Sequence, residues 1–314
     1  KSGRLLLSFI VMAYIIWYVL HEQSGWDWPV ISWREVGFIA LALVFLPINL
    51  GLETLKWQEL LQEDKRRPSF QRLFQGVLAG ISLGIFTPNR IGEYAGRLMF
   101  LPPQQRWRGA IATWINRLDQ MLITLAIGLV SLYGLREVLV DVRMQGWAPW
   151  GSLVSLVWIA CVGLAVFLFA HKWTLQYFPL PKSWKLTRAV RETGESMEWR
   201  QMMVVTGLSL LRYTAFSLQY VWLLYAFGFE GTLALAWHMI ALVFLIKSLA
   251  PIASIAELGI REAVALTIMG YWAVAPSTIL AATLALYVIN LVLPSTAGLY
   301  VLMKGKNSTD FPES

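Results

Sequence analysis

The chain has 314 residues, of which 57% are hydrophobic and 14% are charged, and its formal net charge is +7. Soluble domains usually carry about 25% charged residues, so this composition excludes an ordinary soluble protein. The apolar residues fall in long blocks, each close to the roughly 20 residues that a helix needs to cross a bilayer. We therefore expect an all-α fold, a polytopic membrane helical bundle.

Nine apolar blocks follow one another along the chain, and eight of them predict membrane spans. We place these spans at roughly 5–20, 36–52, 109–133, 151–170, 202–227, 233–250, 260–275 and 277–303. The other block, at about 73–88, ends in Thr-Pro-Asn-Arg and has basic residues on both sides. It predicts a re-entrant or broken helix, because a full span there would move basic residues to the outer side.

Lysine and arginine are distributed unevenly between the two sides of this arrangement. With both termini cytoplasmic, the inner segments hold 20 of these residues and the outer loops hold 3. Because positive residues favour the cytoplasmic side, we predict a multi-pass protein of the cell inner (cytoplasmic) membrane, with residues 1–314 as a single transmembrane domain. The polar stretch 171–201 is predicted as a cytoplasmic loop that forms either an amphipathic surface helix or a plain solvated loop.

Two helix breaks interrupt apolar blocks in similar ways, each with a proline, a new helix start, a glycine, and then Glu and Arg. The helix-break residues are Thr87, Pro88 and Gly92 in the first break and Pro251, Ser254 and Gly259 in the second. Thr87 is expected to cap a helix that starts at Pro88, and Ser254 with Glu257 resembles a capping box. Paired breaks indicate a binding site in a transporter, and they are also what an internal repeat would produce; the alternative is a pair of glycine-packed kinks.

Charged residues lie at these breaks and within the predicted spans, where charges usually face a protein interior or a wet cavity. The candidate substrate-binding residues are Arg90, Glu93, Arg97, Arg117, Asp119, Arg212, Glu257, Arg261 and Glu262. Arg117 and Asp119 are two residues apart, so they point in different directions on a helix and each needs a partner on another element. Polar stripes that include Arg117 and Arg212 either line one cavity or form hydrogen bonds between helices.

The residues at the breaks resemble the flippase-like transmembrane domain of lysylphosphatidylglycerol synthases. The resemblance rests on Thr87 to Glu93 with Arg97, on Pro251 with Leu258 to Glu262, on Glu53 to Leu61, and on Asn116 to Asp119. It covers nearly the whole chain, but Ala256-Glu257 stands where the family usually has Gly-Gly. The resemblance implies movement of a lipid between leaflets. It does not imply the lipid-lysylating activity, because the aminoacyl-transferring domain is not part of this sequence.

Catalytic and cofactor motifs are not found: the chain contains no HExxH, GxSxG or P-loop sequence. The single cysteine, Cys161, and three scattered histidines do not predict a metal site, so we expect no cofactor and no enzyme activity. The expected partners are membrane lipids with an anionic headgroup or a polyprenyl phosphate, without nucleic acid; an oligomer is left open. The leading hypothesis is a passive or ion-coupled lipid translocase. Alternatives are an intramembrane transferase with a lipid-linked donor and a non-transporting lipid-binding scaffold.

Overall fold

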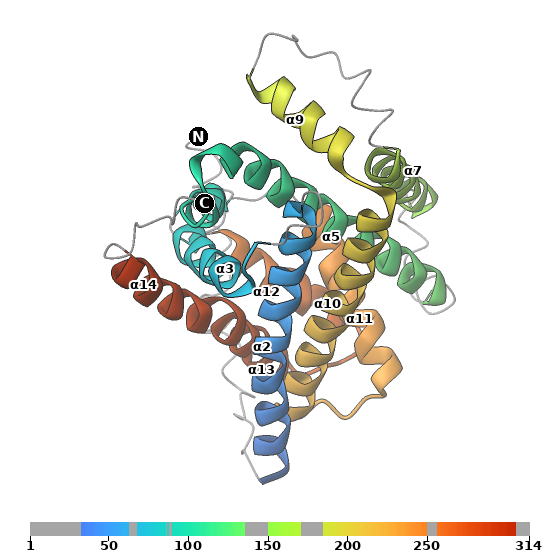
Figure 1. The fold of residues 1–314 in the computed structure, drawn as a ribbon. Helices are drawn as coiled ribbons and strands as arrows, with labels where there is room; N and C mark the ends of the chain where they lie inside the picture. Colours follow the sequence, from blue (N-terminus) through green and yellow to red (C-terminus); the bar gives the residue numbers. More distant parts are fainter. Residues whose placement is uncertain are drawn as a thin grey trace.

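Every regular element that the structure describes is a helix (Figure 1). The computed structural model describes residues 33–62, 68–85, 87, 90–135, 150–170, 185–249 and 256–305. The helices are α2 (Trp33–Leu61), α3 (Phe70–Ile85), α4 (Ile91–Leu98), η3 (Pro103–Gln105), α5 (Arg106–Gly134), α7 (Trp150–Phe169), α9 (Lys185–Ser196), α10 (Trp199–Ala226), α11 (Leu233–Leu249), α12 (Ala256–Gly270), α13 (Pro276–Tyr287), η5 (Val288–Val292) and α14 (Leu293–Gly305). The predicted all-α helical bundle is confirmed.

Three stretches of the described helices are long and apolar enough to cross a membrane. They are Glu35–Leu61, Pro103–Gly134 and Pro276–Lys304, and shorter apolar helices occupy Val154–Phe169 and Leu233–Leu249. The predicted spans at 202–227 and 260–275 are the helices α10 and α12, but α10 carries a polar stripe and α12 has only 15 residues. The predicted span at 5–20 lies outside the described residues, so the count of eight spans stays a prediction.

Helix α2 is longer than the sequence predicted, because its last turns are buried. The apolar block ends at residue 52, yet the helix continues to Leu61. Trp57 and Leu60 in this extension are completely buried and pack with residues of α3 and α5 such as Val77 and Ala112. The charged residue Glu53 therefore lies within a packed helix, where the hydropathy pattern had placed a loop. Burial of the apolar side chains on either side stabilises this arrangement.

Helices α3 and α4 form a tight hairpin, which agrees with the predicted break. A Cβ added at Gly76 would meet the backbone of Arg97, one at Gly80 would meet Glu93, and one at Gly84 would meet Glu93 and Arg90. Rising residue numbers in α3 thus face falling numbers in α4, so the chain reverses direction. Glycines on both helices allow this close backbone approach, as small residues do between membrane helices.

The start of α4 differs from the prediction. The helix begins at Ile91 rather than at Pro88, which lies outside the described residues. Arg90 occupies the N-cap position with a left-handed backbone, φ 54°. Thr87 still serves the helix end, because its hydroxyl accepts a hydrogen bond from the Gly92 N–H at 2.7 Å and donates one to the Leu83 carbonyl at 3.1 Å. One of the free N–H groups at this helix start is thereby satisfied.

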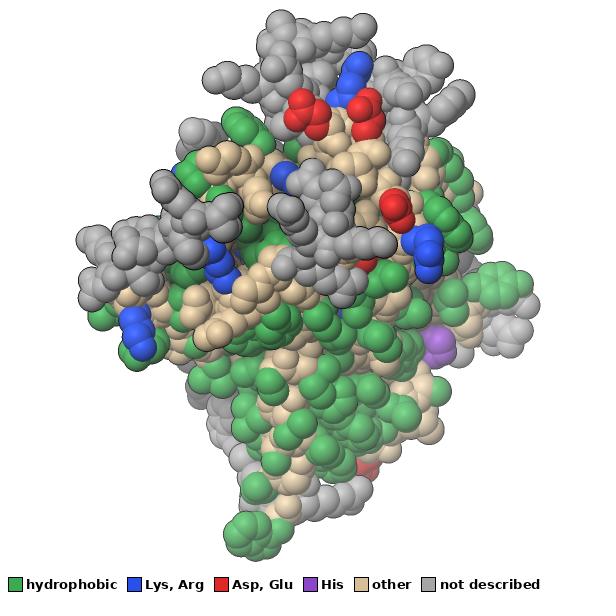
Figure 2. Space-filling view, viewed as in Figure 1, with side chains coloured by type: hydrophobic (Ala, Val, Ile, Leu, Met, Phe, Trp, Pro, Cys, Tyr) green, Lys and Arg blue, Asp and Glu red, His purple; other side chains and the backbone are tan. Residues whose placement is uncertain are grey.

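The polar connections gather at one end of the bundle. Arg108 at the start of α5 donates hydrogen bonds to the Gln62 carbonyl after α2 and to Ser196 at the end of α9, while Gln201 in α10 donates to the Glu59 carbonyl. Figure 2 shows most of the visible charged side chains toward this end, near α9, and a largely hydrophobic surface over the rest of the face. These contacts join the described elements α2, α5, α9 and α10 at that end.

Candidate functional site

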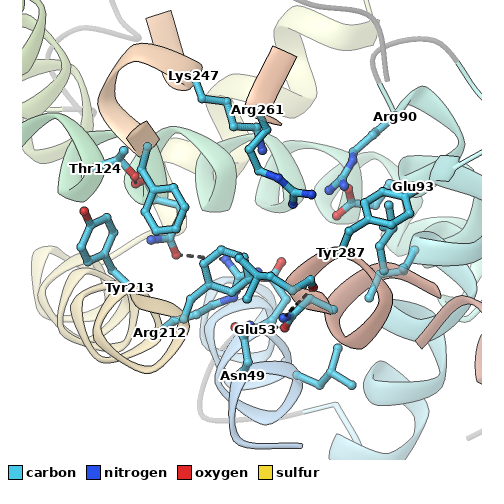
Figure 3. Close-up of a pocket in the computed structure, with 18 of the residues that line it drawn as sticks. Asn49, Glu53, Arg90, Glu93, Thr124, Arg212, Tyr213, Lys247, Arg261 and Tyr287 are labelled. Atoms are coloured by element: carbon cyan, nitrogen blue, oxygen red, sulfur yellow. Dashed lines mark hydrogen bonds and ion pairs between the residues drawn. The ribbon is translucent and has the colours of Figure 1, made fainter. Parts of the chain in front are cut away.

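A cavity of about 540 Å³ lies between the helices (Figure 3). Its volume is within the range of about 300–1,000 Å³ that small-molecule sites show. Charged residues that line it are Glu53, Arg90, Glu93, Arg97, Arg212, Lys247 and Arg261, and neutral polar residues are Asn49, Gln120, Thr124, Tyr213, Ser248, Tyr287 and Asn290. The remaining wall is apolar and includes Ile81, Phe216, Phe244 and Leu291. The cavity is therefore amphipathic.

Charged residues beside both helix breaks line this cavity. Arg90, Glu93 and Arg97 come from the first break, and Lys247 and Arg261 flank the second. The sequence left open whether the breaks lie together, and the described residues beside them, on the hairpin α3–α4 and on α11 and α12, line the same space. Figure 3 shows Arg90 and Arg261 extending from different helices toward its open centre.

Arg97 is the most buried of the charged residues that line the cavity, with 1% of its surface exposed. Its Nη2 atom lies 2.5 Å from Oε1 of Glu53 and 2.6 Å from Oε1 of Glu93, so one nitrogen links α4 to α2. The guanidinium also lies over the Trp57 ring at 5.4 Å from the ring centre. Its Nε and Nη1 atoms are buried without hydrogen-bond partners among the described residues. Arg97 is thus held firmly and keeps unused donor groups.

Arg117 and Asp119 find separate partners, as their spacing predicted. Arg117 places Nη2 2.5 Å from Oε2 of Glu93, and its guanidinium lies 4.9 Å from the Tyr94 ring centre. Asp119 accepts a hydrogen bond of 2.6 Å from Thr206 and a second from Ser209, both on α10. Neither Arg117 nor Asp119 lines the cavity directly. They tie α5 to α4 and to α10 around it.

Arg212 connects the polar stripe of α10 to the same cluster. Its Nη1 donates to Oε1 of Gln120 at 3.2 Å, and its Nε lies 3.3 Å from Oε2 of Glu53 without the geometry of a hydrogen bond. Lys56 also reaches Gln120, at 3.1 Å. Asn116 donates to Glu53 at 2.7 Å. The Glu53 carboxylate of α2 is therefore contacted by residues of three other helices, α4, α5 and α10.

Arg261 presents the charge of the second break. Its Nη2 lies 2.6 Å from Oε1 of the adjacent Glu262 and donates to the Thr283 carbonyl at 3.0 Å, and its guanidinium lies 5.6 Å from the Tyr287 ring centre. Gly259 is buried in the same helix. Pro251, Ser254 and the side chain of Glu257 lie outside the described part of the chain.

Two asparagines that the sequence did not single out also line the cavity. Asn49 donates to the Oδ1 atom of Asn290 at 3.0 Å, and Asn290 donates to Gln219 at 2.8 Å, which in turn donates to the Ala42 carbonyl at 2.7 Å. Asn290 lies in the π-helix η5, and π-helical turns occur frequently at functional sites. In the sequence, Asn290 could have been singled out because it is a polar residue in the middle of the apolar block 277–303. The sequence analysis named Glu53 only as the first residue of the segment Glu53 to Leu61, which resembles a motif of the family.

The structure and the comparisons together define the class and the family. The described helices form a bundle with membrane-span candidates, and charged residues line a cavity between them. The chain belongs to the family of the lysylphosphatidylglycerol synthase transmembrane region, whose family model matches residues 5–298. This confirms the predicted family and indicates a membrane function related to lipids. A comparison with curated proteins finds no match.

Proposed function

We propose that this protein is a lipid translocase that moves a phosphate-bearing lipid between the two leaflets of the membrane. The observation that carries the proposal is the cavity itself, in which arginines from both helix breaks converge within a membrane helical bundle. Buried positive charges in a membrane protein usually mark the path of a polar or charged substrate. Membership of a family related to membrane lipids supports the same function.

The amphipathic lining suits a lipid better than a free ion. Arg90, Arg212 and Arg261 provide forked donors that match phosphate oxygens. Phe216 and Phe244 form part of the apolar wall, against which the upper part of an acyl or prenyl chain would pack. A headgroup in the polar half and a chain along the apolar half would use both surfaces.

The charged residues have different roles in this proposal. Arg97 is held by Glu53 and Glu93 and fixes the hairpin in place. Arg212 and Arg261 have side chains that reach the cavity from α10 and α12, so they would contact the headgroup directly. Both are therefore better test positions than Arg97, whose removal would also disturb packing.

Movement of labelled lipids in proteoliposomes tests the proposal. Purified protein is reconstituted and the transbilayer movement of lipids with several headgroups is followed for wild type, Arg212→Gln and Arg261→Gln. Glutamine keeps hydrogen-bonding capacity but removes the charge, so we expect movement to fall by about tenfold or more in each variant. Arg200→Gln is the matched control, because Arg200 is an exposed arginine at the start of the same helix as Arg212.

Each outcome separates the competing hypotheses. Loss of movement in both cavity variants, with Arg200→Gln unchanged, supports a translocase with its site at the cavity. Movement that neither variant alters would place the transport path elsewhere. If no lipid moves faster than in protein-free vesicles, the translocase is rejected. A covalently changed lipid would then favour the transferase, and an unchanged one the scaffold.

A further inference from the structure

Building on the proposed function, we infer that the cavity contains a second subsite, beside the arginines, that binds a hydroxyl group of the lipid headgroup. The subsite consists of Asn49 on α2 and Asn290 on the π-helix η5, and both residues line the cavity. It selects a headgroup that carries an uncharged polyol or sugar next to its phosphate. The inference rests on the direction of a hydrogen-bonded chain of amides and on the oxygen that this chain leaves without a partner.

Two backbone carbonyls fix the direction of the amide chain. Gln219 donates from Nε2 to the Ala42 carbonyl at 2.7 Å, so its Oε1 atom accepts the hydrogen bond of 2.8 Å from Asn290. Asn290 donates from the same Nδ2 atom to the Leu286 carbonyl at 3.2 Å. A carbonyl oxygen only accepts hydrogen bonds, so turning either amide over would set two oxygens against each other. Both N–H groups of Asn290 are therefore used within the protein.

The chain ends in oxygen atoms that can still accept hydrogen bonds. Oδ1 of Asn290 accepts one bond of 3.0 Å from Asn49 and has a second lone pair. Oδ1 of Asn49 has no hydrogen-bond partner among the described residues, although only 4% of this residue is exposed. A buried polar atom without a partner is unfavourable, because it has lost its bonds to water without replacement. A ligand group that donates a hydrogen bond removes this cost.

A hydroxyl group fits these amides better than an ammonium group. It donates to an amide oxygen, and it also accepts from the second N–H of Asn49, which the described residues leave unused, whereas an ammonium group only donates. An ammonium group also needs a counter-charge when it is buried. The carboxylate of Glu53, one turn further along α2, already faces Arg97 and Arg212 with its two oxygens. The subsite therefore favours a neutral hydroxyl.

Asn49 lies beside the first of the arginines proposed to contact the phosphate. Asn49 and Glu53 are four residues apart, so they share one face of α2 and lie about one helical turn from each other. Glu53 in turn contacts Arg212. Figure 3 shows Asn49, Glu53 and Arg212 on the same side of the open space, across from Arg261.

Asn290 is close to the second of these arginines. Tyr287 precedes it by three residues, about one helical turn, and the Tyr287 ring centre lies 5.6 Å from the guanidinium of Arg261. A phosphate held by both arginines thus places the first atoms of its headgroup near the two amides. The hydroxyl groups of a polyol or a sugar stand only a few bonds from the phosphate, so they can reach the amides.

Two lipids of equal charge test the selection. Phosphatidylglycerol and phosphatidylpropanol have the same phosphodiester and the same number of headgroup carbons, but only the first carries hydroxyl groups. Binding of their dioctanoyl forms to the purified protein in detergent is measured by titration, with dioctanoyl phosphatidylethanolamine as the amine. We expect phosphatidylglycerol to bind about tenfold more tightly than phosphatidylpropanol, the gain from one or two hydrogen bonds. Phosphatidylethanolamine should bind no better than phosphatidylpropanol.

Variants of Asn49 test whether this residue causes the preference. Asn49→Leu has a similar shape and no polar side-chain atom, so phosphatidylglycerol should lose about tenfold in affinity and bind like phosphatidylpropanol. Asn49→Ala should give the same loss. A general disturbance of packing would instead weaken both lipids and keep their ratio. Thermal unfolding in detergent shows that each variant is folded.

Ser82→Ala is the matched control for these variants. Ser82 is a buried polar residue that links α3 to α14 through its hydrogen bond to the Ser295 carbonyl, and it lies outside the described cavity lining. Its loss removes a buried bond between helices without touching the subsite. The ratio of the two affinities should therefore stay as in wild type.

The outcomes separate this inference from the proposed function. Equal affinity of wild type for the two lipids, or a preference that Asn49→Leu retains, overturns the hydroxyl subsite; the amides then bind water and join helices only. Phosphatidylethanolamine that binds as tightly as phosphatidylglycerol also overturns it. Equal affinity together with movement of both lipids in proteoliposomes leaves the translocase standing without the subsite. A tenfold preference in binding, without movement of any lipid, supports the subsite and rejects the translocase.

Discussion

Two carboxylates, Glu53 and Glu93, connect most of the charged residues of the site. Each carboxylate faces two arginines, and together they join α2, α4, α5 and α10. Removing one partner of a buried ion pair leaves an uncompensated charge and is strongly destabilising, by about 3–5 kcal/mol. These two residues therefore stabilise the cavity walls as well as set their charge.

The first prediction concerns Glu53→Gln. This change leaves the buried Arg97 with a single carboxylate, so we expect the free energy of unfolding in detergent to fall by about 3 kcal/mol or more. Glu230→Gln is the matched control, because Glu230 is exposed near the α10–α11 connection, and it should leave stability unchanged.

A double variant shows whether the loss of stability comes from the ion pair between Glu53 and Arg212. Arg212→Gln in the Glu53→Gln background should cost less than Arg212→Gln alone, because the removed carboxylate no longer needs a partner. If the two losses of stability simply add, Glu53 and Arg212 are not coupled and the ion pair does not stabilise the protein.

Residue patterns predicted only part of this cluster. Glu93 and Arg97 were found because they recur at a helix break, and Arg117 because a charge within an apolar block needs a partner. Glu53 was missed as a site residue because its charge ended the hydropathy block at residue 52. Which arginine a carboxylate contacts depends on how distant helices pack, and a single sequence does not contain that information.

Among the helices, the hairpin of α3 and α4 depends on a close backbone approach. A Cβ at Gly96 would lie 2.5 Å from the Gly80 nitrogen and 2.6 Å from the Ala79 carbonyl carbon, both backbone atoms that cannot move aside. The hairpin positions Arg90, Glu93 and Arg97. Its packing and the geometry of the cavity are therefore linked.

Gly96→Ala tests this link. We expect it to lower the free energy of unfolding by about 1–3 kcal/mol, the usual cost of overpacking, and to slow lipid movement. Gly207→Ala serves as the control, since a Cβ at Gly207 would meet no heavy atom within 4 Å. Equal stability of the two variants would show that the close approach of α3 and α4 is not required.

Most helices could be predicted from the apolar blocks, and their exact ends could not. The break after α3 was expected from Thr87 and Pro88, but α4 starts only at Ile91 because Arg90 takes a left-handed backbone. Such a conformation is uncommon outside glycine and depends on its surroundings. The hairpin reversal and the π-helical turn at Asn290 likewise depend on packing between helices.

For the molecule as a whole, the predicted orientation can be tested with single cysteines. Helix α10 has 28 residues, so its ends lie about 42 Å apart, enough to separate the two sides of a bilayer. After Cys161→Ala, we expect a membrane-impermeant maleimide to label Glu230→Cys in intact cells and Glu195→Cys only after permeabilisation. The reverse pattern would show that the basic end faces outward.

The order in which the chain is made has a consequence for Glu53. Its partners follow later in the sequence, Arg97 by 44 residues and Arg212 by 159, the difference between 212 and 53. Domains begin to fold from the N-terminus during synthesis, so α2 is made before either of these arginines. The ion pairs that join the last turns of α2 to α4 and α10 can form only after the ribosome has produced α10. Until then Lys56, three residues further along the same helix, is the cation nearest in sequence to the Glu53 carboxylate.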